Sequence, residues 1–245
     1  ILASLAKGTS KLYDMLYSED TLASIRVCEA LGAKINRTED YLEVVGTNGN
    51  LHNSSDEPID LANSGTTLRL MTSISALSDN EVILTGDESL QTRPMGLLMD
   101  ALKPLGIETE SLNDNEKAPI LIKPGYLGGE TNIMGNVSSQ FISSILISAP
   151  LSDCGVTLYV LPEFKSKPYV YMTWDIMRKF GFKSIKSYYL KHDSCNQEHQ
   201  SCRIDEFKMH NIGCEYVSRT TEANTSLAFV ALDENKNREF SFYRK

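Results

Sequence analysis

"SIRVCEALGAKI", residues 24–35, is a run of helical periodicity that stops at a glycine and continues as strand-like residues. The same design returns as "LLMDALKPLGIET" at residues 97–109 and as "WDIMRKFGFKS" at residues 174–184. A glycine directly after an amphipathic run is typical of a helix C-cap. The spacing is 74 and then 75 residues, from Gly32 to Gly106 to Gly181.

Other features keep this period. Val82 and Val156, in the strand-like segments "EVILTGDES" and "VTLYVLPEF", lie 74 residues apart, and two helix starts, at Ser64 and Val137, lie 73 apart. A period of this length predicts one structural unit used three times, read as strand, helix, strand, strand and helix in some rotation. The fold class is therefore α/β, and the alternative is ordinary α/β alternation with coincidental spacing.

Each of the two helices should bury one apolar stripe: Leu70, Met71, Ile74 and Leu77 in the first, and Phe141, Ile142, Ile145, Leu146 and Ala149 in the second.

Composition and charge narrow the class of protein. With 41% hydrophobic and 23% charged residues, the 245-residue chain is ordinary for a soluble globular protein, and no apolar run reaches the roughly 18 residues that span a bilayer. The start "ILASLAKG" has no signal-peptide pattern. A net charge of −8 argues against general nucleic-acid binding but is compatible with a local anion site built from a few arginines. Cys28 and Cys154 should be buried free thiols, which suits a reducing cytoplasm.

Two equivalent helices begin with clusters of small polar residues, "NSGTT" at residues 63–67 and "NVSSQ" at residues 136–140. A helix N-terminus exposes unbonded N–H groups and carries about half a positive charge, so added hydroxyl and amide donors make a socket for phosphate or carboxylate. Gly65 lets a ligand approach the backbone, and Arg69 adds a fixed positive charge one turn later. The alternative is plain N-capping by the asparagine that opens each cluster, but capping needs only one such residue.

Two further segments carry donors near helix starts. In "GDESLQTRPMG", residues 86–96, Arg93 precedes a proline and is suited to clamp a carboxylate or phosphate, although an Arg-Pro pair is also a common surface feature. In "EFKSKPYVYMTW", residues 163–174, three donors stand at the start of the third repeat's helix: Ser166, Lys167 and Tyr169. Several such starts facing one point would bind a small molecule with several negative charges.

Taken together, these segments resemble the enolpyruvyl transferases, and among them the 5-enolpyruvylshikimate-3-phosphate synthase family. The resemblance covers residues 1–186 and rests on "LANSGTTLRL", "LTGDESLQTRPMG", "NVSSQFISSILISAPL" and "SKPYVYMTWDIMRKFG". The paralogous enzymes that act on UDP-N-acetylglucosamine carry a cysteine in the loop before the Arg-Pro, whereas "GDESLQTRP" has none. The resemblance implies a domain of three βαβαββ units packed around helices, which agrees with the period found above.

The resemblance implies a cytoplasmic, monomeric transferase of the shikimate pathway of aromatic amino-acid synthesis. Such an enzyme moves the enolpyruvyl group of phosphoenolpyruvate to shikimate 3-phosphate, without metal or other cofactor and with no nucleic-acid or membrane partner. The implied contacts of shikimate 3-phosphate are Ser138, Ser139, Gln140, Ser166 and Tyr169. The implied contacts of phosphoenolpyruvate are Gly65, Arg93 and Gln140, and the pocket floor is formed by Asn63, Thr66 and Arg69.

Two parts of the family's site are expected outside these 245 residues. The family's Lys-Ser motif and a nearby arginine would precede Ile1, and the catalytic Asp and Glu belong to a second domain that nothing after residue 186 resembles. The resemblance therefore implies no catalytic residue within this chain and negligible turnover by it alone. A rival hypothesis from another class is a non-catalytic anion-binding module.

The remaining segments are of a different kind. Residues 187–206 read as a linker or junction, and residues 207–245 as two strands around "DENKN" that resemble the strand pair of fructokinase-type sugar kinases in the ribokinase family. No glycine-rich nucleotide loop accompanies these strands, so no kinase activity is expected. The chain is then interpreted as chimeric or truncated. Alternatively, the segment has lost the partners of its strands and exposes a strand edge. Three histidines and three cysteines in this region could form a zinc site, although their spacing does not match a familiar zinc-binding module. The alternative is a solvated junction. The residues are His192, Cys195, His199, Cys202, His210 and Cys214.

Overall fold

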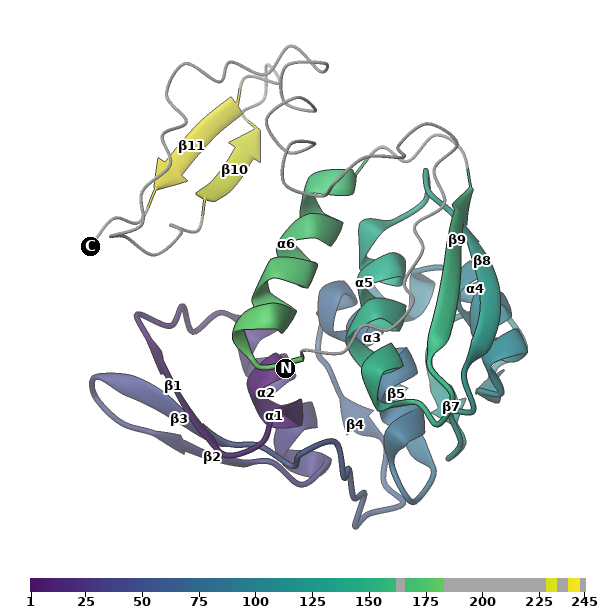
Figure 1. The fold of residues 1–245 in the computed structure, drawn as a ribbon, viewed down its shortest axis with the longest axis horizontal. Helices are drawn as coiled ribbons and strands as arrows, with labels where there is room; N and C mark the ends of the chain where they lie inside the picture. Colours follow the sequence, from purple (N-terminus) through teal and green to yellow (C-terminus); the bar gives the residue numbers. More distant parts are fainter. Residues whose placement is uncertain (162–165, 183–227, 233–237, 243–245) are drawn as a thin grey trace. The chain divides into compact units, whose positions relative to one another are not determined.

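The computed structural model describes residues 1–161, 166–182, 228–232 and 238–242 of the chain (Figure 1). The residues form two compact units, Ile1–Asp193 and Ser194–Lys245. The expected boundaries at residues 186 and 206 lie outside the described ranges and stay predictions. Within those ranges no helix combines the length and the apolar character needed to cross a bilayer.

One complete βαβαββ unit runs from Ile59 to Ile122. The sheet order is β4-β5-β7-β6, in which β4 is parallel to β5 and the other neighbours are antiparallel. Helix α3 is the crossover between the two parallel strands, so it begins at the carboxyl end of β4. The elements are β4 (Ile59–Asp60), α3 (Gly65–Ile74), β5 (Val82–Thr85), α4 (Gly96–Leu102), β6 (Thr109–Ser111) and β7 (Ile120–Ile122).

Parts of the same unit flank the complete one. Before it, a sheet of order β1-β3-β2 repeats the β5-β7-β6 arrangement, and after it the parallel strands β8 and β9 are joined by α5, just as β4 and β5 are joined by α3. The predicted α/β repeat is therefore confirmed on these residues. The flanking elements are α1 (Leu2–Leu5), β1 (Thr9–Tyr13), α2 (Glu19–Ala30), β2 (Lys34–Arg37), β3 (Tyr41–Val45), β8 (Gly129–Met134), α5 (Ser139–Ser148), β9 (Val156–Leu161) and α6 (Lys167–Lys179).

The three glycines that define the period follow the ends of equivalent helices in the left-handed conformation. Gly32, Gly106 and Gly181 have φ angles of +98°, +79° and +84°. Each glycine N–H donates to the carbonyl three residues earlier, at 3.0, 3.1 and 3.2 Å. Because residues with a side chain rarely adopt this conformation, the glycines are the local cause of the three chain reversals.

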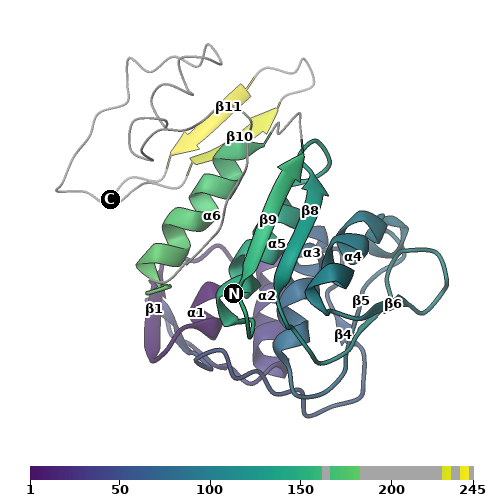
Figure 2. The same ribbon diagram turned by 45° about the vertical axis from the view of Figure 1, so that its right-hand side comes forward.

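Helices α3 and α5 lie side by side in the middle of the first unit, with α6 next to α5 (Figures 1 and 2). The Ser144 hydroxyl bonds that of Ser73 at 2.7 Å and donates to the Leu70 carbonyl at 3.0 Å, and one turn later the Ser148 hydroxyl donates to Ser73 at 3.1 Å. These pairs are 71, 74 and 75 positions apart. The two helices are therefore parallel and start at equal height, and the sequence period is also the register of their packing.

The burial of the two helices differs from what the sequence predicted. In α3, Met71 and Ile74 are buried and the other predicted stripe residues are partly buried against the core. In α5 every residue from Phe141 to Ser148 is buried, so the prediction of a single apolar stripe was too narrow. The reason is that α5 has a helix on each side: α3 on one, and α6 on the other, where Ser143 bonds Thr173 at 2.8 Å.

The two cysteines of the first unit also differ. Cys28 in α2 is buried, as expected, but Cys154 is exposed, so that expectation was wrong. Cys154 lies in the turn before β9, where its backbone N–H donates to the Leu127 carbonyl at 2.9 Å and Gly155 follows with a φ of +76°. The apolar strand pattern that suggested burial begins only after this turn.

The second unit contains an antiparallel strand pair, β10 (Ala228–Leu232) and β11 (Arg238–Phe242). Ala228 lies opposite Phe242 and Leu232 opposite Arg238. The two predicted strands are therefore confirmed, whereas the predicted turn between them, residues 233–237, lies outside the described residues. The six His and Cys residues of the suggested zinc site lie outside the described residues.

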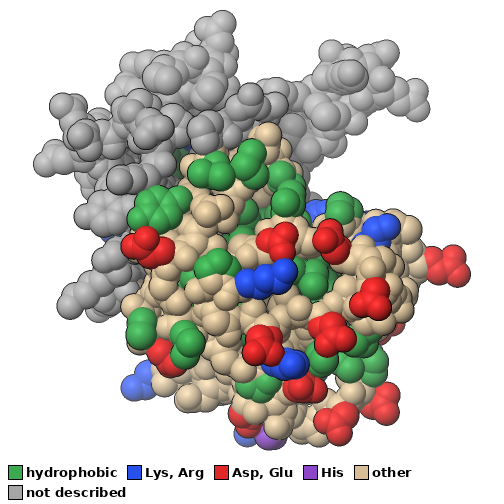
Figure 3. Space-filling model, turned by 90° about the vertical axis from the view of Figure 1, so that its right-hand side faces the viewer, with side chains coloured by type: hydrophobic (Ala, Val, Ile, Leu, Met, Phe, Trp, Pro, Cys, Tyr) green, Lys and Arg blue, Asp and Glu red, His purple; other side chains and the backbone are tan. Residues whose placement is uncertain are grey.

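The surface of the first unit mixes charges of both signs. On the face drawn in Figure 3, acidic side chains lie among scattered basic and hydrophobic ones. Two exposed ion pairs on the described residues, Lys103–Asp100 and Lys123–Glu108, have N–O distances of 2.8 and 3.0 Å. Exposed pairs of this kind contribute little to stability, so the apolar core is the main source of stability.

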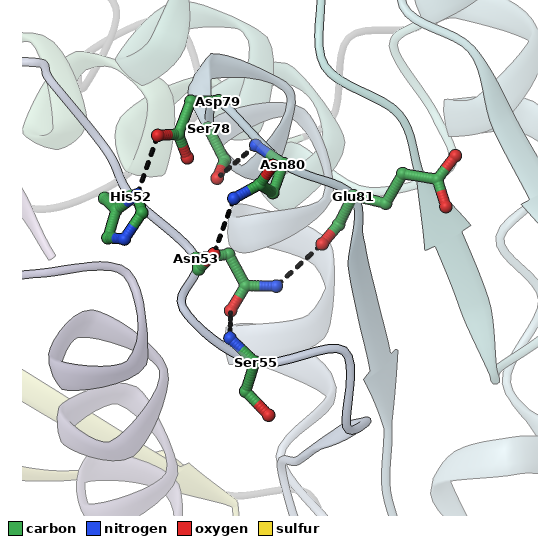
Figure 4. A network of polar contacts seen from close by, with 7 residues as sticks. All are labelled: His52, Asn53, Ser55, Ser78, Asp79, Asn80 and Glu81. Atoms are coloured by element: carbon green, nitrogen blue, oxygen red, sulfur yellow. Dashed lines mark hydrogen bonds and ion pairs between the residues drawn. The ribbon is translucent and has the colours of Figure 1, made fainter.

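A polar network ties the segment before β4 to the turn before β5 (Figure 4). The side chain of the buried Asn53 donates from Nδ2 to the Glu81 backbone carbonyl at 2.6 Å. The backbone carbonyl of Asn53 accepts from Asn80 Nδ2 at 2.9 Å. At the exposed edge of the network, His52 Nδ1 lies 2.7 Å from Asp79 Oδ2. These side-chain hydrogen bonds hold together the loops that precede β4 and β5, two strands that pair over only two residues each.

Candidate anion-binding site

The polar cluster at the start of α3 divides into two groups with different partners. Ser64 is the N-cap and accepts from the Thr67 N–H at 3.2 Å, while its hydroxyl donates to the Asp20 carboxylate of α2. The Thr67 hydroxyl lies 2.7 Å from that of Ser24, also in α2. Ser64 and Thr67 are both buried, so these two residues dock α3 on α2, and the expected donor socket applies to the other residues of the cluster.

Asn63 and Gly65 instead face Arg93. The Arg93 guanidinium donates from Nη2 to Asn63 Oδ1, and a Cβ added at Gly65 would overlap its Nη1. Gly65 is therefore glycine because the guanidinium lies against the first residue of α3. The Arg93 backbone is held in turn by its N–H bond to the Leu90 carbonyl at 3.1 Å.

Arg69 and Gln140 join the first turns of α3 and α5. Arg69 Nη1 donates to Gln140 Oε1 at 2.7 Å, and Gln140 Nε2 donates to the Thr66 hydroxyl at 2.9 Å. Arg69 is half-buried over the Phe141 ring, and its Nε is buried without a hydrogen-bond partner among the described residues. Burial, and secondly the positive charge of Arg93, lower the pKa of Arg69. Two guanidinium groups therefore lie close enough to repel each other.

The remaining candidates lie at the starts of α5 and α6. Ser138 is the N-cap of α5 and accepts from the Gln140 N–H at 3.2 Å, and Ser139 is the first helical residue. Ser166 precedes α6 and makes no capping hydrogen bond, and Tyr169 is 60% exposed. Strands β8 and β9 are parallel, and α5 and α6 follow them, so both helices begin near one edge of the pair.

The structure thus brings six predicted residues into one contact set made of two groups, which meet where Gly65 and Thr66 are adjacent in the chain: Asn63, Gly65 and Arg93 form one group, and Thr66, Arg69 and Gln140 form the other. Ser138 joins them through the backbone of Gln140, with Ser139 beside it. No hydrogen bond within the described ranges joins the side chains of Ser166 or Tyr169 to the set. Two guanidinium groups, two amides, hydroxyls and two helix starts in one place suit a phosphate or carboxylate.

Sequence reasoning missed Asp87, which bonds the candidate residue Asn63, and Asp20, which bonds the N-cap Ser64. Asp87 accepts from Asn63 Nδ2 at both carboxylate oxygens, at 3.1 and 2.9 Å. One signal would have found Asp87: it follows β5 just as Asn63 follows the parallel strand β4, so the two meet at one sheet edge. Asp20, which accepts from Ser64, gave no such signal.

Two other features of the first unit lie apart from this set. A groove of about 650 Å³ between α2 and the segment before β4 is lined by Arg26, Glu57 and Asp60 among others, and by none of the candidate residues. Within the described ranges no three His, Cys, Asp or Glu side chains are grouped to hold a metal ion.

Comparison with known proteins identifies one family. The family model of EPSP synthase (3-phosphoshikimate 1-carboxyvinyltransferase) matches residues 1–191. The chain is 64% identical over 235 residues to the 3-phosphoshikimate 1-carboxyvinyltransferase of Methanobrevibacter smithii, covering 95% of this chain and 54% of that protein. It is 51% identical over 181 residues to that of Methanothermobacter thermautotrophicus, covering 74% and 42%. The chain spans about half the length of the curated relatives it matches.

The fold has a counterpart among solved structures. An EPSP synthase from Acinetobacter baumannii aligns with a TM-score of 0.58 at 24% identity, covering 66% of this chain and 37% of that one. At this identity the likeness concerns the fold alone. It agrees with the repeated α/β units described above.

The resemblance of residues 207–245 to a sugar kinase is not supported. The match to the Methanobrevibacter smithii protein covers 95% of the chain, so most of this segment lies inside an alignment to a carboxyvinyltransferase. Two short alternating strands around a polar turn occur in many α/β proteins, which is why the pattern was a weak signal.

Proposed function

Because the chain belongs to the EPSP synthase family, we propose that it supplies the shikimate 3-phosphate-binding part of a 3-phosphoshikimate 1-carboxyvinyltransferase. Such an enzyme joins the enolpyruvyl group of phosphoenolpyruvate to shikimate 3-phosphate and releases phosphate. Each substrate carries one phosphate and one carboxylate. The site must therefore offset several negative charges within a small volume.

The observation that carries the proposal is the position of Arg69 beside Arg93. Two guanidinium groups that repel each other are stabilised when an anion lies between or above them. Arg69 Nε is buried without a hydrogen-bond partner among the described residues, and a ligand oxygen would supply one. Phosphoenolpyruvate, bound against Gly65 and Arg93, meets both requirements.

Gln140 is placed to contact both substrates. Its Oε1 accepts from Arg69 and its Nε2 donates to Thr66. One neighbour is therefore a hydrogen-bond donor and the other an acceptor, and together they set the orientation of the amide. We assign phosphoenolpyruvate to Gly65, Arg93 and Gln140, with Asn63, Thr66 and Arg69 as the pocket floor. We assign shikimate 3-phosphate to Ser138, Ser139, Gln140, Ser166 and Tyr169.

The chemistry is addition followed by elimination. A general acid protonates the methylene carbon of phosphoenolpyruvate while a ring hydroxyl of shikimate 3-phosphate attacks the adjacent carbon, and a base then removes a proton as phosphate leaves. Arg93 and Arg69 would stabilise the shifting carboxylate and phosphate charge through all of these steps. None of the assigned residues is a carboxylate or an amine, so we expect this chain to bind both substrates but to turn over negligibly by itself.

Calorimetric titration of the 245-residue chain tests the proposal. Shikimate 3-phosphate is titrated first, and phosphoenolpyruvate in its presence. Arg93→Ala should weaken phosphoenolpyruvate binding about tenfold or more, since a charge-assisted hydrogen bond is lost. Arg37→Ala, which removes an equal charge from β2, should leave both affinities unchanged.

The same titrations separate the proposal from its rival. A heat signal that is alike for sulfate, phosphate and shikimate 3-phosphate, and insensitive to Arg93→Ala, would favour a non-catalytic anion-binding module. Steady-state release of phosphate at the rate of a full-length relative would contradict the expectation of negligible turnover.

A further inference from the structure

Asn63 connects the Arg93 guanidinium to the Asp87 carboxylate. Asn63 Nδ2 donates to the two carboxylate oxygens of Asp87, at 3.1 and 2.9 Å, and Asn63 Oδ1 accepts from Arg93 Nη2. A guanidinium has only donors and an ionised carboxylate only acceptors. The amide of Asn63 can therefore satisfy both neighbours in one orientation alone.

Asp87 is itself held in place. Its backbone N–H donates to the Ala62 carbonyl at 3.0 Å, and its Oδ1 accepts from the Leu90 N–H at 2.8 Å. A Cβ added at the preceding residue, Gly86, would overlap the same Ala62 carbonyl, so the two loops are in close contact. The Leu90 N–H first, and then the Asn63 side chain, lower the pKa of Asp87 and keep it ionised.

We propose that Asp87 is a positioning residue for the phosphoenolpyruvate site, acting through Asn63 to hold the Arg93 guanidinium against Gly65. The identity of the ligand rests on the function proposed above. A carboxylate in direct contact with Arg93 would compete with the ligand for its charge. The amide of Asn63, placed between Asp87 and Arg93, instead fixes the orientation of the guanidinium and leaves its outer face free for an anion. The guanidinium is thereby preorganised for binding.

The sharpest variant is Asp87→Asn, which keeps the size of the side chain and an oxygen for the Leu90 N–H. Its new amide places a donor opposite Asn63 Nδ2, and a flip of Asn63 to relieve that clash would turn a donor toward Arg93. We expect the affinity for phosphoenolpyruvate, measured by calorimetry with shikimate 3-phosphate present, to fall about tenfold. Affinity for shikimate 3-phosphate alone should stay within about twofold, because its proposed contacts lie on α5 and α6.

Three further variants complete the test. Glu88→Gln removes an equal charge from an exposed neighbour on the same loop and should leave both affinities unchanged. Asn63→Ala should reproduce the loss, and Asn63→Ala combined with Asp87→Asn should be no weaker than Asn63→Ala alone, because the two residues act in series. Additive losses, or unchanged phosphoenolpyruvate affinity in Asp87→Asn, would overturn the proposal.

A readout without ligand separates this inference from the proposed function. In the wild-type chain labelled with 15N, the Arg93 guanidinium should rotate slowly and give resolved signals, and Asp87→Asn should broaden or merge them while the rest of the spectrum is retained. If that change occurs but the wild-type chain binds neither substrate, the proposed function fails and the positioning role stands. If the Arg93 signals do not change, the positioning role fails whatever the chain binds.

Discussion

Gln140 accepts a hydrogen bond from Arg69 at 2.7 Å, although the two residues are 71 positions apart and belong to successive repeats. The same amide donates to Thr66, 74 positions away. Because α3 and α5 are parallel and start at equal height, equivalent first turns meet, and each contributes donors to the same place. The repeat therefore brings together the residues of the candidate site as well as those of the core.

Replacement of Gly65 by alanine should damage the phosphoenolpyruvate site without unfolding the protein. The added methyl group would occupy the space of Arg93 Nη1 and displace the guanidinium. We expect a loss of about tenfold or more in phosphoenolpyruvate affinity by calorimetry, since a small displacement of a charged donor is costly. The far-UV circular dichroism should be retained, and unchanged affinity would show that Arg93 does not contact the ligand.

The packing of α3 on α5 requires a small residue at position 144. Ser144→Leu should overfill the contact with Ser73 and lower the free energy of unfolding by about 1–3 kcal/mol or more. Ser144→Ala should cost only about 1 kcal/mol, since it removes hydrogen bonds without adding volume. Urea denaturation measures both, and equal losses for the two variants would contradict close helix packing.

Asn53 should be one of the more sensitive polar positions outside the site. Asn53→Ala leaves the Glu81 carbonyl without its side-chain donor and should lower the free energy of unfolding by about 1–3 kcal/mol. Asn50→Ala, an exposed change on the same segment, should stay within about 0.5 kcal/mol of wild type. A similar small effect for both would mean that the network of Figure 4 does not hold the two loops.

Acid should loosen the same network at its edge. The hydrogen bond from His52 is the main cause that lowers the pKa of the Asp79 carboxyl below its ordinary 3.8. A carboxyl with a lowered folded-state pKa contributes stability above the unfolded value and loses it as the pH falls through the folded one. Between pH 5 and 2 the thermal midpoint should therefore fall more steeply for wild type than for Asp79→Asn. Parallel curves would exclude this contribution.

Much of the fold was readable because its causes are local. A glycine after an amphipathic run specifies a left-handed C-cap whatever surrounds it, and Gly32, Gly106 and Gly181 all adopt that conformation. Their spacing then predicted the repeat. The full burial of α5 was not readable, because it depends on α6 packing on the face opposite α3.

The site was readable in part for the same reason. An excess of donors at two helix starts identified Asn63, Thr66 and Gln140, and all three lie in the contact set. What sequence could not separate is which hydroxyl serves the ligand and which serves the fold: the Ser64 hydroxyl bonds α2. Asp87 acts through Asn63, and such a partner is visible only once β4 and β5 are known to be neighbours.

We propose that donors from successive repeats converge on one anionic metabolite. Backbone chemical-shift mapping of the 15N-labelled chain, titrated with shikimate 3-phosphate and then phosphoenolpyruvate, tests it most directly. We expect saturable shifts grouped at residues 63–69, 90–95, 137–141 and 166–170, with the second ligand moving chiefly the first two groups. Shifts scattered over the surface, or confined to a single one of these segments, would contradict it.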